Sequence, residues 1–185
     1  SLLNLSIGVS ILSIPVIAEE NYGWYATGSI GRSLITDIEY KNDASQKVKF
    51  DGGLGFDLGF GYDFGSTRIE GTWNRGQSPG GTDRANVFST VTSIDSFLLS
   101  GFYDFRSSKK WSPFGGISIG STNVDHLDKE DTGTSYGLAL GIAYKTYDYT
   151  ELYFKTTGIV TPELDAIGLH DGSYGNATVG VRFIF

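Results

Sequence analysis

The sequence of 185 residues contains no cysteine, no methionine and only four prolines. Without cysteine the chain forms neither a disulfide framework nor a cysteine-ligated metal site, and it has no thiol nucleophile. A lipid anchor on an N-terminal cysteine is excluded for the same reason. Positive charge is also scarce, since 14 Lys and Arg stand against 21 Asp and Glu, for a net charge of −7. Nucleic-acid binding normally needs a basic face, so we expect no nucleic-acid partner.

A long apolar run occurs only once, at residues 2–18, where LLNLSIGVSILSIPVIA carries no charge. It ends in VIA directly before two glutamates, which is typical of the h-region and cleavage site of a secretory signal peptide. A transmembrane anchor is the alternative, but Pro15 and several polar residues interrupt the run, and it is short for a membrane span. We expect residues 1–18 to be a cleavable signal peptide without its basic n-region, and residues 19–185 to be the exported domain.

Residues 51–65, DGGLGFDLGFGYDFG, alternate between two kinds of side chain. The odd positions are Asp or Gly, and the even positions from 54 onward are Leu, Phe or Tyr. A GxGxxG nucleotide loop would need its third glycine at Leu58, and no GK[ST] sequence occurs, so a phosphate-binding loop is excluded. A period of two predicts a β-strand with two unlike faces.

The same period recurs along the chain and predicts eight strands. We expect them at residues 23–35, 47–62, 67–76, 91–105, 112–122, 134–146, 150–160 and 173–185. Most reach the roughly 9–11 residues that a tilted membrane-crossing β-strand needs. Long polar loops are expected after the first, third, fifth and seventh strands, including 123–133 and 161–172, with tight links between. This alternation is typical of outer-membrane barrels, so we predict an all-β fold, a closed eight-stranded antiparallel up-and-down transmembrane β-barrel.

The apolar face of these strands is expected to contact lipid. Aromatic residues beside the tight links form an expected interfacial girdle: Trp24, Tyr62, Tyr103, Phe105, Trp111, Tyr144, Phe183 and Phe185. Trp73, Tyr136 and Tyr174 are expected to mark the opposite interface. The alternative is a soluble lipocalin-like barrel with its apolar face inward, which the long strands and the aromatic strand ends disfavour.

The other face is small or charged and is expected to fill a polar lumen. An eight-stranded barrel has an interior just wide enough for side chains. The expected lumenal charge network comprises Asp57, Arg68, Glu70, Lys145, Glu151, Lys155 and Arg182. Buried charges need partners, so we expect Asp57, Glu70 and Glu151 to pair with Arg68, Lys155 and Arg182. The glycines of 47–62 are expected to clear volume for these long cations.

Four segments, GWYATGSIG, STRIEGTW, SFLLSGFYDF and NATVGVRFIF, resemble strands of the OmpA/opacity-like outer-membrane β-barrel family. The resemblance covers residues 22–185. It implies an integral protein of the bacterial outer membrane, in contact with outer-membrane lipid and lipopolysaccharide. Phe185, preceded by alternating apolar residues, resembles the family's C-terminal assembly signal. This implies the barrel-assembly machinery and periplasmic chaperones as partners during biogenesis.

Catalytic and metal-binding chemistry have weak support in the sequence. His170, Asp171 and Ser173 are the residue types of a catalytic triad, but triads are assembled from distant segments, so we expect no catalytic residues, no enzyme and no cofactor. The acidic segment 123–133 offers a candidate cation site, although its spacing does not match an EF-hand loop. The candidate ligands are Asp125, Asp128, Glu130 and Asp131. A solvated acidic tip, or cation bridges to lipopolysaccharide phosphates, are the alternatives, and no other metal site is expected.

We expect a structural or surface-interaction role, in which the long loops meet an unknown extracellular partner. The second hypothesis is a narrow porin-like channel lined by Arg68, Glu70, Lys155 and Arg182. The third, an outer-membrane lipid-modifying enzyme, is disfavoured by the absence of a plausible triad.

Overall fold

A computed structural model describes residues 23–35, 38–40, 43–48, 53–78, 92–105, 108, 110–126, 129–164 and 169–185. The expected signal peptide, residues 1–18, lies outside the described residues. Within these ranges no helix is long and apolar enough to cross a membrane.

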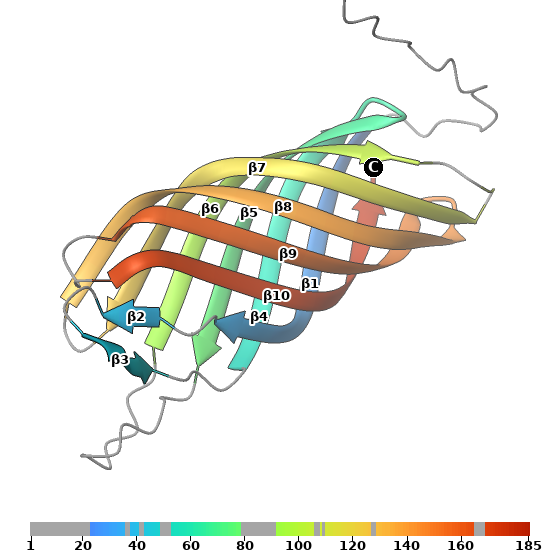
Figure 1. The fold of residues 1–185 in the computed structure, drawn as a ribbon. Coiled ribbons are helices and arrows are strands. Elements are labelled where there is room, and N and C mark those ends of the chain that lie inside the picture. The colour runs from blue at the N-terminus through green and yellow to red at the C-terminus, as the bar shows by residue number, and fades with distance from the viewer. Residues whose placement is uncertain are drawn as a thin grey trace, which may run out of the picture.

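The described chain is built from antiparallel strands (Figure 1). They are β1 (Gly23–Ile35), β2 (Ile38–Tyr40), β3 (Asp43–Val48), β4 (Gly53–Asp63), β5 (Thr67–Ser78), β6 (Thr92–Asp104), β7 (Trp111–His126), β8 (Lys129–Tyr147), β9 (Thr150–Leu164) and β10 (Leu169–Ile184). β1 and β4–β10 pair in that order, and β1 also pairs with β10. The predicted closed eight-stranded antiparallel barrel is therefore confirmed, because no strand of this ring is left with an open edge.

The closing seam between β1 and β10 runs from the pair Tyr25–Ile184 to the pair Ile35–Tyr174. Near its first end the last residue is tied back, since the amide of Phe185 donates to the carbonyl of Trp24 at 2.9 Å. We call this end of the barrel, where Gly23, Phe185 and the short links lie, the turn end. The opposite end, where β2 and β3 lie, is the hairpin end (Figure 1).

The link between β4 and β5 shows why a glycine is required at the turn end. Gly65 has a φ of 102°, in the left-handed region that only glycine adopts without strain. Its amide donates to Oδ1 of Asp63 at 2.7 Å, which stabilises the turn by an Asx-type bond. The tight link predicted here is present, and it reverses the chain within three residues.

Two expectations about the hairpin end were wrong. The strand predicted at 47–62 begins at Gly53, and a separate hairpin, β2–β3, precedes it and pairs with the start of β10. The loops predicted at 123–133 and 161–172 are largely strand, since β7 continues to His126, β8 starts at Lys129 and the β9–β10 ladder reaches Leu164 and Leu169. The polar side chains suggested loops, but they do not prevent strand pairing. A β-ladder is held by backbone hydrogen bonds, and these form whether the side chains are polar or apolar.

The length of β8 shows how far the wall extends. Its 19 residues span roughly 65 Å at about 3.4 Å per residue. With a tilt of about 45°, it rises about 45 Å along the barrel axis, against an apolar band about 25 Å tall in barrels of this kind. The strands therefore continue well beyond the apolar band.

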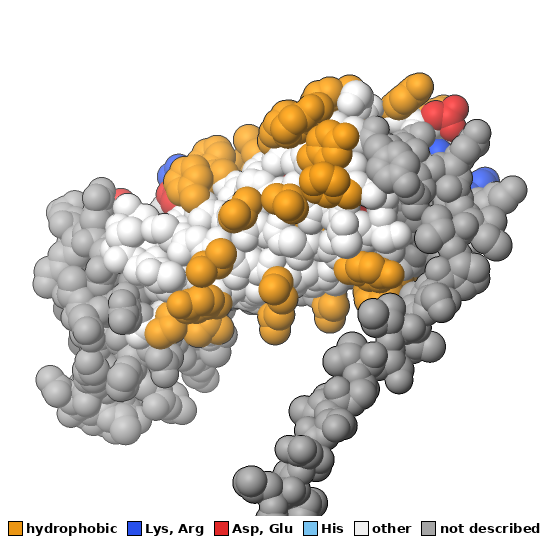
Figure 2. All heavy atoms as spheres, turned by 90° about the horizontal axis from the view of Figure 1, so that it is seen from above, with side chains coloured by type: hydrophobic (Ala, Val, Ile, Leu, Met, Phe, Trp, Pro, Cys, Tyr) orange, Lys and Arg blue, Asp and Glu red, His pale blue; other side chains and the backbone are white. Residues whose placement is uncertain are grey.

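On the face shown in Figure 2, hydrophobic side chains gather over the middle of the wall, and the visible charged side chains lie toward its ends. Six predicted girdle residues, Trp24, Tyr103, Phe105, Trp111, Phe183 and Phe185, are exposed on the outer face, and Tyr62 and Tyr144 are half-buried there. Neighbouring rings pack together, as Trp111 does with Tyr144 at 4.7 Å between centroids. The expectation for Tyr174 was wrong, because its ring is 6% exposed and lies inside the barrel.

Inward glycines of β4 make room for neighbouring side chains. A Cβ atom at Gly61 would overlap the ring of Tyr25 and a backbone oxygen of Ile69, and one at Gly59 would meet the carboxyl group of Glu70. We had expected these glycines to accommodate Arg68, Lys155 and Arg182. The side chains nearest to them are instead Tyr25 at Gly61, and Thr27 and Glu70 at Gly59.

We predict that Gly61→Ala lowers the free energy of unfolding by about 1–3 kcal/mol, because overpacking displaces the ring of Tyr25 and the β5 backbone. Gly28→Ala is the matched control, since the added methyl group faces outward and meets only Leu58 at an ordinary 3.7 Å. Urea unfolding of both variants in lipid vesicles measures the difference. Equal stability of the two would contradict this account of the interior.

Candidate functional site

In the middle part of the barrel, the charged side chains point into the interior. Five of the seven residues of the predicted network are almost completely buried there: Asp57, Arg68, Glu70, Lys155 and Arg182. None of these five residues is more than 5% exposed. Isolated buried charges would be strongly unfavourable, so their partners decide what the interior does.

Asp57 of β4 is the centre of the first group. Its carboxylate lies 3.1 Å from Nζ of Lys155 on β9 and accepts hydrogen bonds from Ser29 Oγ at 2.9 Å and Asn176 Nδ2 at 3.0 Å. Ser29 belongs to β1 and Asn176 to β10. Because β1 and β10 lie between β4 and β9 in the ring, these contacts cross the closing seam from inside.

Arg68 of β5 forms the second group with Asp104 of β6. Its Nε lies 2.6 Å from Oδ2 and its Nη2 donates to Oδ1 at 3.2 Å, a two-point pairing. The expected carboxylate partners did not include Asp104, although it alternates with the outward Tyr103 and Phe105. Glu70 is farther from Arg68, at 3.9 Å.

Aromatic rings enclose the same guanidinium group. Its carbon lies 4.6 Å from the ring centre of Phe102 and 5.1 Å from that of Phe114. Cation–π contacts of this kind are favourable where the cation is removed from water. Arg68 is therefore held by a carboxylate and by the faces of interior rings at once.

The third group lies nearer the turn end, where Nη1 of Arg182 donates to Glu151 at 2.7 Å across neighbouring strands. Lys145 stands apart from the three groups. It is about one-third exposed and lies 3.7 Å from Asp148, in the exposed link between β8 and β9. Its place is the rim of the turn end.

The interior is less polar than predicted. One buried apolar cluster comprises Ile94, Leu98, Val124, Ile159 and Tyr174, and a second comprises Phe102, Phe114, Ala139, Ala143 and Tyr153. Beside the first cluster, hydroxyl groups form a buried chain of hydrogen bonds from Ser96 through Thr122 and Ser135 to Thr161, with oxygen–oxygen distances of 2.6–2.8 Å. The inward positions are thus filled by side chains that bond or pack with one another.

The candidate cation ligands lie at the far end of β7 and β8. Asp125 is exposed and stands opposite Glu130 in the ladder, while Asp131 stands opposite Val124. Asp128 lies outside the described residues. Among the residues that the structure describes, no group of three or more His, Cys, Asp or Glu could hold a metal ion. The side chains of His170 and Asp171 also lie outside the described part.

Removing one partner of the seam-crossing pair tests its contribution. We predict that Asp57→Ala lowers the free energy of unfolding by about 3–5 kcal/mol, because it leaves the ammonium group of Lys155 buried without its carboxylate. The double variant Asp57→Ala/Lys155→Met should lose clearly less. Arg75→Ala, which breaks the half-exposed pair with Asp95, is the control and should change stability by about 1 kcal/mol or less. A double variant no more stable than Asp57→Ala would contradict the assignment.

Comparison with known proteins agrees with this architecture. A family model described as "Outer membrane protein beta-barrel domain" matches residues 5–185. No curated protein matches the chain. Neisserial surface protein A superposes with a TM-score of 0.66 at 17% identity, over 88% of this chain and 97% of that one. OprG from Pseudomonas aeruginosa superposes with a TM-score of 0.54 at 14% identity, over 90% of this chain and 98% of that one.

These solved structures share the fold at low identity, and the family model spans nearly the whole chain. The chain therefore belongs to the outer-membrane β-barrel domain family and is a protein of the bacterial outer membrane.

Proposed function

We propose that this protein is a closed, non-conducting barrel that holds an extension at the cell surface and acts through contacts made there. The observation that carries the proposal is the filled interior. Inward side chains from each of the eight barrel strands are buried from water, and the interior cations pair with carboxylates inside the barrel. A conducting pore needs a lumen lined by side chains in contact with water.

The second hypothesis, a narrow channel, would use Arg68, Glu70, Lys155 and Arg182 to line a path for solutes. Arg68 and Arg182 are engaged with Asp104 and Glu151. Rings of Phe102 and Phe114 lie against the guanidinium group of Arg68. These contacts favour a structural role for the charges over a role in transport.

The hairpin end supplies the surface for interaction. Beyond the apolar band, the outward positions of β7 and β8 become polar: Ser121, Asn123, Asp125, Thr132 and Thr134. Such a polar wall is suited to water. We infer that the hairpin end faces the exterior, with an extracellular partner still to be identified, and that the turn end faces the periplasm.

Biogenesis completes the proposal. Phe185 is 68% exposed on the outer face, in line with Phe183 and Val179. An exposed aromatic at the end of the last strand is accessible to the barrel-assembly machinery before the seam closes. Outer-membrane lipid and lipopolysaccharide would then surround the apolar band.

From the closed interior we predict that the protein does not conduct ions. In planar bilayers the folded protein should produce no steady single-channel openings, because the interior cations are paired with carboxylates and aromatic rings lie against Arg68. Insertion is verified by the electrophoretic shift between unheated and boiled samples, since folded outer-membrane barrels often resist SDS until heated. Steady openings whose conductance changes in Glu70→Ala would refute the proposal in favour of the channel.

The orientation is testable because the chain has no native cysteine. Asp125→Cys, at the exposed far end of β7, should react with a membrane-impermeant maleimide on intact cells. Asp148, in the link at the turn end, has a side chain that is 86% exposed, and Asp148→Cys should react only after the outer membrane is permeabilised. The reverse labelling pattern would show that the barrel is inserted in the opposite sense.

A further inference from the structure

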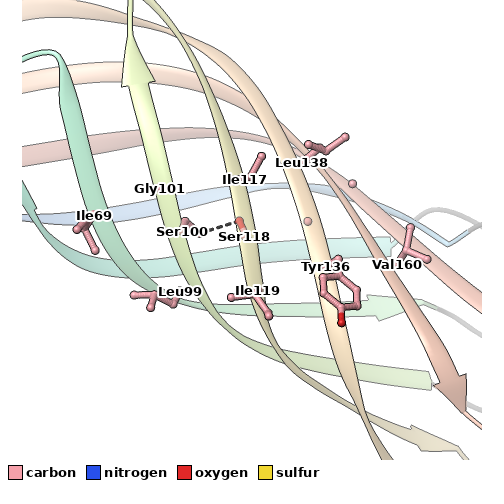
Figure 3. Close-up of a pocket in the computed structure, with 12 residues that line it drawn as sticks. Ile69, Leu99, Ser100, Gly101, Ile117, Ser118, Ile119, Tyr136, Leu138 and Val160 are labelled. Atoms are coloured by element: carbon pink, nitrogen blue, oxygen red, sulfur yellow. Dashed lines mark hydrogen bonds between the residues drawn. The ribbon is translucent and has the colours of Figure 1, made fainter. Parts of the chain in front are cut away.

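The outer wall of the barrel is hollowed in the middle of its apolar band. A depression of about 790 Å³ spreads over β5 to β9, with Ile69 and Leu99 at one end and Tyr136 and Val160 at the other (Figure 3). We propose that this groove binds one hydrocarbon chain of a membrane lipid in a fixed position. The proposal does not rest on the function above, since the wall faces lipid whether or not the lumen conducts.

The register of the strands explains the shape of the groove. Gly101, Ile117, Leu138 and Gly158 stand opposite one another on β6, β7, β8 and β9. Ile117 and Leu138 are 69% and 67% exposed and form a ridge. The groove runs between this ridge and the next outward pair, Ile119 and Tyr136, and it widens at the glycine on either end of the ridge.

Packing within the protein does not require glycine at these two positions. A Cβ atom at Gly101 or Gly158 would meet nothing within 4 Å, in contrast to the inward Gly61, where it would overlap Tyr25. Glycine also weakens a strand, because it has the greatest backbone freedom to lose and no side chain to pack. Glycine inside a strand marks a bulge, a bend or the close approach of a ligand or another backbone. The ladders have no register shift at Gly101 or Gly158, and the open side here is the side that faces lipid.

A second hollow continues the first. It has a volume of about 720 Å³, surrounds Gly71 and is lined on its far side by Phe60 and Trp73. Leu99 and Ile119 line both hollows. Together they cross six strands from β4 to β9, a length of about 24 Å at about 4.8 Å between strands. A depression that extends across several strands fits an extended chain better than a compact side chain.

The chemistry of the lining selects a hydrocarbon. None of the described residues that line the two hollows is charged. The hydroxyl groups of Ser100 and Ser118 are buried and bonded to each other at 2.8 Å, so they offer nothing to an occupant. Three more lining residues carry a hydroxyl group: Thr72, Ser121 and Tyr136. Thr72 donates its hydroxyl to Glu70 inside the barrel, and most of the other lining side chains are aliphatic or aromatic, which suits the hydrocarbon chain of a lipid.

Lipid is favoured over a second copy of the protein. The groove is continuous with the lipid-facing wall, where acyl chains are present at the concentration of a solvent and occupy it by mass action. A specific protein interface buries about 1,200–2,000 Å², whereas two convex barrels meet along a narrow strip. The groove also runs across strands tilted by about 35–45°, so a bound chain lies oblique to the bilayer normal and is held more rigidly than bulk lipid.

Filling the groove tests the proposal. Gly158→Leu places a side chain in the hollow, and Gly101→Leu does the same on the other side of the ridge. Thr156→Leu is the matched control, because it adds the same side chain to the same outer face of β9 outside the groove. Each protein is reconstituted with palmitoyl-oleoyl phosphatidylcholine in nanodiscs and released for native mass spectrometry, after electrophoresis has shown that it is folded.

We expect the wild type and Thr156→Leu to retain one lipid per barrel, and both glycine variants to lose it. Spin-labelled phosphatidylcholine should show the matching loss of a motionally restricted component. Equal retention by Gly158→Leu and the wild type, or no retained lipid in any of them, would overturn the proposal. A dimeric wild type that becomes monomeric in Gly158→Leu would also overturn it, because the occupant would then be a second copy.

Discussion

The carboxylate of Asp57 lies where the barrel has to be closed. The first and last strands, which are far apart in sequence, meet at a seam. Asp57 bonds to Ser29, Lys155 and Asn176, which lie on the strands that form or flank this seam. A buried carboxylate without these partners would be strongly unfavourable. The favourable arrangement therefore requires β4, β1, β10 and β9 to be assembled together, which links the electrostatics of the interior to the closure of the wall.

The strands face lipid on the outside and a narrow interior on the inside, and these two environments explain the rest of the architecture. Lipid on the outside selects the apolar face and tolerates no open sheet edge. The narrow interior excludes water, so charges there pair and apolar side chains cluster, as Arg68 does with Asp104 between Phe102 and Phe114. Glycine serves both sides, since inward glycines accommodate rings and outward glycines leave hollows in the wall.

Much of the interior was visible in the sequence, but the partners were not. Alternation placed Asp57, Arg68, Lys155 and Arg182 on one face, and all are buried inside. Arg68 was nevertheless expected to pair with a carboxylate other than Asp104, its nearest one. The choice between inward carboxylates depends on the stagger of neighbouring strands, and a period of two carries no information about stagger.

The sequence by itself determined the number of barrel strands, the face of each that meets lipid and the girdle of rings at the turn end, because these follow from local alternation and from turn residues such as Gly65. Only the tertiary structure decided that Tyr174 points inward, that the strands extend into the segments expected as loops, and that Gly101 and Gly158 flank one ridge. The physical reason is that closure of the ring sets the register and curvature of all eight strands jointly, and neither property belongs to any one segment.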